Sequence, residues 1–255
     1  MAIFLIVIVF ILIAAGLAWF FVTHDHGEKE PIGALWIAFG FGFMGAIAAA
    51  VLETFLVKNG NMTPPAPLRT ILSSSLTVGV IEESCKFIPL ALLIYGKRYF
   101  NEHTDGIIYF AIAGLGFGLP ENILYTVQFG SSTGISRIFL TPIFHATTTA
   151  IVGFFLIRAK LSHRSPLYCV PALIFAMLAH GFYDFGLSSN SGLIAFVSIL
   201  ITISLSISLF WLYFRATELD QRIGLSAVGN NKFCRNCGFP NPHRNLYCTR
   251  CGQRA

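Results

Sequence analysis

The sequence predicts an all-α polytopic membrane protein with about seven transmembrane helices and a small cysteine-rich module at its C-terminus. Its mean hydropathy is +0.70, with 55% hydrophobic and only 11% charged residues, which is far from the composition of a soluble domain. A spanning helix needs ~20 mostly apolar residues, and seven such stretches follow one another before residue 215. Four of the six cysteines then stand in two close pairs near the C-terminus.

The seven stretches cover residues 3–22, 33–57, 70–95, 106–127, 138–157, 167–187 and 193–214. The first is expected to be a retained helix, because it lacks a basic n-region and has no small-residue cleavage pattern before Thr23. Within the fourth, Gly114, Gly116 and Gly118 follow no strand. They therefore predict close helix packing rather than a nucleotide-binding loop.

The basic residues of the short loops predict the orientation in the membrane. With the N-terminus outside, the inner loops carry six of them and the outer loops three. The inner ones are Lys29, Lys97, Arg98, Arg158, Lys160 and Arg164, and the outer ones are Lys58, Arg69 and Arg137. The C-terminal tail adds seven more on the inner side. We therefore expect a multi-pass protein of the cell membrane with a cytoplasmic C-terminus, whose basic residues lie near lipid headgroups; nucleic acid is not required to explain them.

The chain divides into a transmembrane domain over residues 1–214, a polar linker over 215–231 and a cysteine module over 232–255. Two C-x-x-C pairs with ten residues between them can present four thiolates to one tetrahedral zinc. The four ligands are Cys234, Cys237, Cys248 and Cys251. The module is similar to small zinc ribbons, in which the metal supplies folding free energy that so short a segment lacks. Disulfides are the alternative, but they rarely persist in a reducing compartment. A protein partner for the ribbon stays open.

Ionisable residues recur inside the apolar stretches. They are Glu82, Glu83 and Lys86 in the third, Glu121 beside Asn122 in the fourth, His145 in the fifth, and His180 with Asp184 in the sixth. A charge within a bilayer costs several kcal/mol unless it is paired or hydrated, so clusters on four helices predict a buried functional site. Glu53, near a helix end, is expected to be solvated at the interface.

Helical spacing brings these residues toward common faces. Glu82 and Glu83 lie three or four residues before Lys86, and His180 lies four before Asp184. Pro120, next to Glu121, frees a carbonyl and favours a kink. At ~1.5 Å per residue, the glutamate pair lies ~18–20 Å from the outer surface, and Glu121 and the two histidines roughly 9–11 Å. Such a set can supply a base for water, donors for an oxyanion and an acid for a leaving amine.

The chain resembles the PrsW family of intramembrane proteases over roughly residues 30–215. The resemblance lies in Glu82-Glu83-x-x-Lys86, Phe117-x3-Glu121-x3-Tyr125, His145-x7-Gly153 and His180-x3-Asp184. That family is related more distantly to the CAAX prenyl protease and bacteriocin-processing superfamily. The resemblance implies cleavage of a membrane-anchored protein, with anti-sigma factors as the best-known kind of substrate.

The resemblance also implies roles for the site residues. Glu82 and Glu83 would activate water, and His145 and His180 would stabilise the oxyanion or bind metal. Glu121, Asn122 and Asp184 would orient them.

Two mechanisms remain open at this point. Glu121, His145 and His180 could form a catalytic zinc site with an open position, or Glu82 could act as the base without a metal. The absence of an H-E-x-x-H pair favours the metal-free scheme.

Two other functions also fit buried charges in a membrane protein. An ion-coupled transporter would relay protons through glutamate, lysine and histidine residues, but no inverted repeat is evident. A non-enzymatic receptor with a zinc ribbon would leave the buried charges unexplained.

Overall fold

The computed structural model describes residues 2–25, 29–57, 66–228, 231–233, 240–242 and 251. Its helices are α1 (Ala2–His24), α2 (Ile32–Leu56), α3 (Leu68–Ile94), α4 (His103–Phe129), α5 (Ser131–Arg137), α6 (Leu140–Leu161), α7 (Val170–Ser188) and α8 (Gly192–Val228). A short 3-10 helix, η1 (Pro166–Cys169), precedes α7. The seven long helices match the seven predicted stretches in order, and the short α5 was not expected.

Six of the long helices have the length and composition of membrane spans. The remaining one, α3, is 27 residues long but contains Glu82, Glu83 and Lys86. These three side chains are buried against other helices, so the protein itself solvates the charges that lower the hydropathy of α3. The predicted all-α polytopic fold is confirmed.

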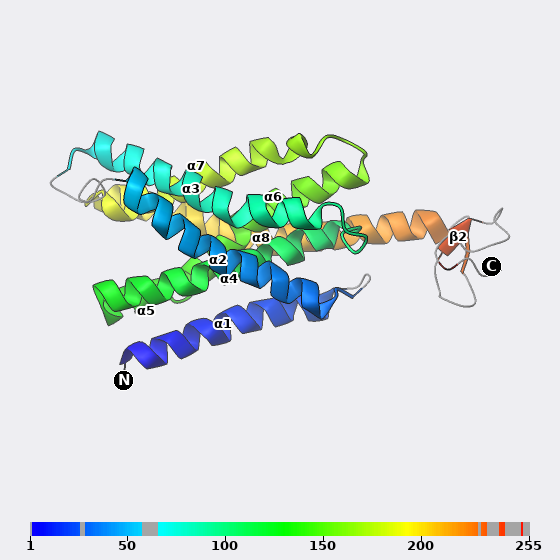
Figure 1. Cartoon of the computed structure of the whole chain (residues 1–255), viewed down its shortest axis with the longest axis horizontal. Coiled ribbons are helices and arrows are strands. Elements are labelled where there is room, and N and C mark those ends of the chain that lie inside the picture. The colour runs from blue at the N-terminus through cyan, green and yellow to red at the C-terminus, as the bar shows by residue number, and fades with distance from the viewer. Residues whose placement is uncertain are drawn as a thin grey trace.

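The long helices run roughly along one common axis, and α1 begins at the end of the bundle opposite to the C-terminal strands (Figure 1). Helix α4 lies in the middle, where every residue from His103 to Gly118 is buried. A helix with apolar residues on all sides is suited to this central position, because neighbouring helices cover its whole surface. Helices α3 and α6 pack against α4 and carry Glu82, Glu83, Lys86 and His145, and α7, with His180, packs against α3 and α6.

Glycines let the neighbours of α4 approach closely. A Cβ at Gly114 would lie 2.3 Å from the His145 carbonyl oxygen of α6, and one at Gly116 would lie 2.2 Å from the Phe39 carbonyl oxygen of α2. Real Cβ contacts are never this short, so only glycine permits these helix separations. The predicted packing role of these glycines is confirmed.

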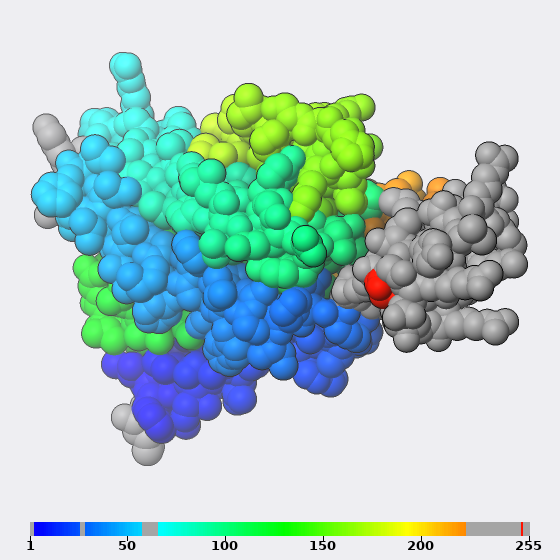
Figure 2. All heavy atoms as spheres, turned by 45° about the vertical axis from the view of Figure 1, so that its right-hand side comes forward, coloured from blue at the N-terminus to red at the C-terminus, as the bar shows by residue number. Residues whose placement is uncertain are grey.

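The outside of the bundle is apolar. Large hydrophobic side chains such as Phe4, Trp36, Phe55 and Leu92 are exposed on α1, α2 and α3. In a space-filling view, α1 lies along one side of the molecule and α2 covers the middle of the same face (Figure 2). Because no polar layer covers these side chains, the surface is suited to lipid rather than to water.

Most of the region predicted to be a linker, residues 215–231, is helical instead. Helix α8 continues without a break to Val228, so residues 215–228 are helical. Glu218 pairs with Arg215 and Arg222 along one face. Asp220 accepts hydrogen bonds from the backbone N–H groups of His103 (2.8 Å) and Thr104 (2.9 Å), which anchors α8 to the start of α4. The polar composition of residues 215–228 was interpreted as a linker because the sequence alone does not show that Asp220 binds the start of α4.

Beyond α8, strands β1 (Asn231–Phe233) and β2 (Pro240–Pro242) pair antiparallel, with Lys232 opposite Asn241. Cys234, Cys237 and Cys248 lie outside the described residues, and Cys251 is described as exposed. The predicted zinc ribbon therefore stays a prediction.

Candidate active site

The glutamate pair of α3 faces the interior of the bundle. Glu83 is fully buried, and its Oε1 lies 2.9 Å from Lys86 Nζ, 2.7 Å from His180 Nδ1 and 3.0 Å from Thr148 Oγ1. Helices α3, α6 and α7 thus meet at one carboxylate oxygen. Charge-assisted hydrogen bonds of this kind hold a buried carboxylate in its ionised form and in one orientation.

Lys86 is the centre of the cluster. Its side chain is fully buried, and its Nζ lies 2.9 Å from His145 Nδ1 and 3.2 Å from His180 Nδ1. The ammonium also lies 4.2 Å from the centre of the Phe117 ring. A lysine ammonium can only donate, so it fixes His145 Nδ1 as an acceptor and places the ring proton of that histidine on Nε2.

Glu82 is held much less tightly than Glu83. Its Oε2 lies 3.4 Å from Lys86 Nζ and 3.2 Å from His180 Nε2, yet it is buried and has no hydrogen bond within the described part of the chain. The two neighbouring carboxylates therefore differ in how firmly they are held: three donors fix Glu83 through Oε1, and no comparable set of donors fixes Glu82. Oε2 of each is buried without a hydrogen bond in the described part of the chain.

Helix α4 adds Glu121 and Asn122. Glu121 Oε2 lies 2.7 Å from His145 Nε2, opposite the nitrogen that contacts Lys86. Helix α4 runs through Pro120 without interruption, and Phe117 on the same helix packs against the His145 ring with centroids 5.6 Å apart. His145 is thus fixed on both ring nitrogens and on one face.

Arg137, at the end of α5, was expected in an outer loop but is buried in the site. It forms an ion pair with Glu121, its Nε donates to Asn122 Oδ1 over 2.9 Å, and its guanidinium lies 4.0 Å from the centre of the Tyr125 ring. The missed signal was weak, since a single arginine in a short polar stretch is typical of a loop. Its position depends on α5, which turns back after Gly130 at a φ of +89°.

Two further residues extend the site beyond the prediction. Thr148, one turn after His145, supplies the third donor to Glu83. Glu53 was expected to be solvated, but its Oε1 is buried and lacks a hydrogen bond within the described residues. Asp184 is more peripheral, since its Oδ2 lies 3.7 Å from His180 Nε2.

One group of three described residues has the geometry of metal ligands. Glu82, His145 and His180 each offer a ligand atom, and these atoms lie within 4.8 Å of one another. The group differs from the predicted trio in one member, because Glu121 is not in it and Glu82 is. Because Lys86 contacts His145 Nδ1 and the ring proton lies on Nε2, His145 Nε2 can bind a metal only after it loses that proton.

All the predicted site residues of the transmembrane domain therefore come together from α3, α4, α6 and α7. They lie in the half of the bundle where α1 begins, because Glu121 and His180 are eight residues before the ends of their helices and His145 is five after the start of α6. The arrangement offers a buried carboxylate with spare acceptor capacity beside an ammonium and two imidazoles. This set can activate water and stabilise a negative oxygen.

Comparison with known proteins identifies the family. The model of the PrsW family intramembrane metalloproteases matches residues 30–213. Protease PrsW of Bacillus subtilis (strain 168) is 29% identical over 86% of this chain and 100% of its own length. Protease PrsW of Geobacillus kaustophilus (strain HTA426) is 31% identical over 69% of this chain and 79% of its own. No solved structure matches this chain. These matches favour a protease over the transporter and the receptor considered from the sequence.

Proposed function

Since this chain belongs to the PrsW family of intramembrane proteases, we propose that its buried cluster hydrolyses a peptide bond of a membrane-anchored protein. The observation that supports this most directly is the difference between the two glutamates. Three donors hold Oε1 of Glu83, whereas Glu82 has only looser ion-pair contacts, and its Oε2 is buried without a hydrogen bond in the described region. A general base needs such a free acceptor beside the attacking water.

We assign the proton transfer from water to Glu82. Lys86 and His145 supply positive charge and an N–H group for the oxygen that becomes negative in the transition state. Glu83 holds Lys86 and His180 in place. Glu121, with Asn122 and Arg137 behind it, orients His145, and Asp184 lies behind His180.

The donor set also fits a divalent metal ion. Glu82 Oε2 is buried without a hydrogen bond among the described residues, and Glu82, His145 and His180 form the one three-residue ligand group found there. We propose that these three residues hold the ion, most simply zinc. With the ion bound, Glu82 is a ligand rather than the base, and with no ion bound it takes the proton from water. A bound ion of this kind lowers the pKa of a water molecule and polarises a carbonyl.

The substrate that we propose is a membrane-anchored regulator such as an anti-sigma factor, cut near the outer face of the membrane. The support for this side is the placement of the site near the end where α1 begins, together with Lys97, Arg98, Arg158, Lys160 and Arg164 at the other end. With Arg137 buried in the site, only Lys58 and Arg69 remain of the three outer basic residues counted from the sequence.

The test is turnover of a fluorescent transmembrane peptide by the purified full-length protein in lipid. We expect cleavage by the parent protein and none by Glu82→Gln. A parent protein that binds metal and peptide but leaves the peptide intact under all conditions would contradict the proposal. Cleavage that persists in Glu82→Gln would contradict only the role of Glu82.

A further inference from the structure

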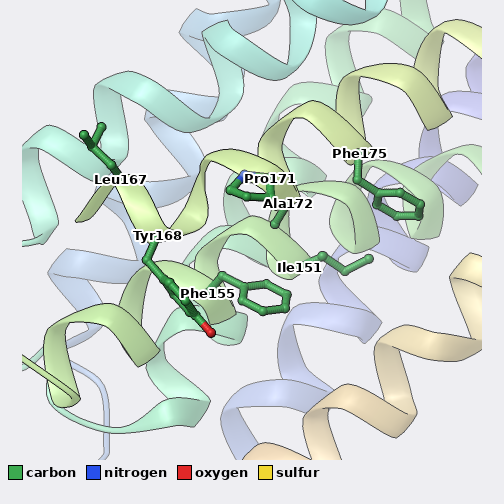
Figure 3. Close-up of a pocket in the computed structure, with 7 residues that line it drawn as sticks. All are labelled: Ile151, Phe155, Leu167, Tyr168, Pro171, Ala172 and Phe175. Carbon is green, nitrogen blue, oxygen red and sulfur yellow. The ribbon is translucent and has the colours of Figure 1, made fainter. Parts of the chain in front are cut away.

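Two apolar grooves lie at the end of the bundle opposite to the active site. The first, of about 540 Å³, lies between α6, η1 and the start of α7. Phe155 and Tyr168 lie side by side in it, with Ile151 and Phe175 further along (Figure 3). The second, of about 510 Å³, lies between α6 and the second half of α8. Each volume is within the range of ligand pockets, roughly 300–1,000 Å³.

The two grooves form one branched surface. Ile151, Phe155 and Phe175 line both of them. The first groove contains no charged residue, and its walls are aromatic and aliphatic side chains with one proline. A long apolar group could therefore lie in each branch, with a shared junction at Phe155.

The second groove has a basic rim. Arg158, at the end of α6, and Arg215, on α8, both line it, and no acidic side chain does. Arg158 is exposed and forms no ion pair with any residue that the structure describes. Arg215 pairs with Glu218, which also pairs with Arg222, so this trio of two arginines and one glutamate keeps a net charge of +1.

Trp211 places this rim at the membrane surface. It lines the second groove, is 67% exposed and lies four residues before Arg215 on α8. Tryptophan side chains concentrate at the boundary between headgroups and acyl chains. Arg215, one turn beyond Trp211, is then at the depth of lipid phosphates, Arg158 lines the same groove, and the grooves extend from this rim into the acyl region.

We propose that this surface binds an anionic phospholipid, with the headgroup phosphate between Arg158 and Arg215 and one acyl chain in each groove. A free phosphate would use the arginines but leave the apolar branches empty, whereas a diacyl lipid fills both parts. Basic pockets between transmembrane helices are suited to anionic headgroups for this reason. The lipid would bridge α6 and α7, which carry His145 and His180.

Trp211 provides the reporter for the test. The chain has three tryptophans, and the other two, Trp19 and Trp36, are exposed on α1 and α2 and can be replaced by phenylalanine. The full-length protein is placed in zwitterionic nanodiscs that contain a minor fraction of either phosphatidylglycerol or phosphatidylcholine with brominated acyl chains. We expect the brominated anionic lipid to quench Trp211 as if it were enriched on the order of ten-fold at the site.

Matched variants assign the enrichment to the site. Arg158→Gln combined with Arg215→Gln should remove it, whereas Arg98→Gln, an exposed arginine at the same end of the bundle, should not. Ser208→Phe fills the second groove and should also remove it, whereas Ser204→Phe, exposed on the same helix outside the groove, should not. Soluble glycerol phosphate should not compete.

Equal quenching by the two brominated lipids would overturn the proposal. An enrichment that survives in the double arginine variant, with its thermal unfolding unchanged, would do the same. If glycerol phosphate competed and Ser208→Phe still showed normal enrichment, the arginines would bind a free anion and the lipid proposal would be wrong.

Discussion

At the residue scale, the site depends on the different environments of two adjacent carboxylates. Glu82 and Glu83 have the same chemistry, but Lys86, Thr148 and His180 all contact Oε1 of Glu83, and no such set of donors holds Glu82. Helical geometry causes the difference, because successive residues on a helix are turned by about 100° and meet different neighbours. This separates a positioning carboxylate from a reactive one.

Replacing either glutamate by glutamine should abolish proteolysis, but the two variants should differ in stability. Glu83→Gln leaves the buried Lys86 ammonium without its closest counterion, which costs roughly 3–5 kcal/mol of unfolding free energy. Glu82→Gln removes a looser contact and should change stability much less. Peptide cleavage and thermal unfolding of both variants are the measurements. Near-normal cleavage by both single variants and by the double variant would exclude these residues from the reaction.

Arg137 should affect proteolysis indirectly, by holding Glu121 in position. Arg137→Gln removes the ion pair that holds Glu121 beside His145, so we expect a 10- to 100-fold loss, about the size seen when residues behind a metal ligand are removed. The loss should fall on kcat, and Arg137→Lys should restore part of it. Arg69→Gln, which is exposed at the same end of the bundle, is the control. Equal activity of Arg137→Gln and Arg69→Gln would show that Glu121 needs no such support.

At the element scale, close helix packing determines whether the site residues can meet. Gly114 lets the α6 backbone at His145 contact α4, and Gly79 lets α3 approach α7, since a Cβ there would lie 2.4 Å from the Met177 carbonyl oxygen. The same contacts set the distance between the helices that carry the glutamates and the histidines. The packing of these helices therefore also sets the distances between the residues of the proposed active site.

Gly114→Ala should lower both stability and activity. The added methyl group would meet backbone atoms of α6, which cannot move aside as a side chain can. We therefore expect the free energy of unfolding to fall by about 1–3 kcal/mol. Gly40→Ala is the matched control, because a Cβ there meets nothing within 4 Å and alanine favours helix by up to ~1 kcal/mol. Thermal unfolding and peptide cleavage are compared. Identical behaviour of the two variants would mean that α4 and α6 tolerate separation.

At the scale of the whole molecule, the chain has two expected metal sites in different places. One is the group of Glu82, His145 and His180 within the bundle, and the other is the set of C-terminal cysteines, of which only Cys251 is among the described residues. Helix α8 connects the two regions continuously from Gly192 to Val228. The sites can therefore be separated by truncation after this helix.

The full-length protein should contain two zinc ions per chain, and removal of residues 229–255 should leave one. Elemental analysis of both proteins, purified without added chelator, is the measurement. A count that falls from one to none would leave Glu82 acting on water without a metal. Glu82→Gln in the truncated protein should lower the remaining count, which assigns that ion to the bundle.

The orientation of the whole chain is tested by cysteine labelling in a background without the native thiols. Ser132, exposed on α5, and Ser165, exposed before η1, lie at opposite ends of the bundle. An impermeant maleimide added to intact cells should label Ser132→Cys and not Ser165→Cys, because the active-site end is expected to face outward. The reverse pattern would place the proposed cleavage on the cytoplasmic side.

The sequence by itself determined the membrane class and the order of the long helices, and it predicted most of the buried ionisable residues that the structure brings together. These follow from properties local to each segment: apolar length for the helices, and the high cost of a buried charge for Glu82, Glu83, Lys86, Glu121, His145 and His180. The close helix packing at Gly114 and Gly116 could also be predicted from the sequence, because it requires only that these residues have no side chain.

Only the tertiary structure decided which of these residues contact one another. It brought Arg137 from an apparent loop to Glu121, turned Glu53 inward, continued α8 through an apparent linker and grouped Glu82, rather than Glu121, with the two histidines as candidate ligands. Each of these depends on partners far away in the chain, such as His103 and Thr104 for Asp220. A polar residue has the same local signature whether water or a distant side chain satisfies it, and only the folded arrangement distinguishes the two.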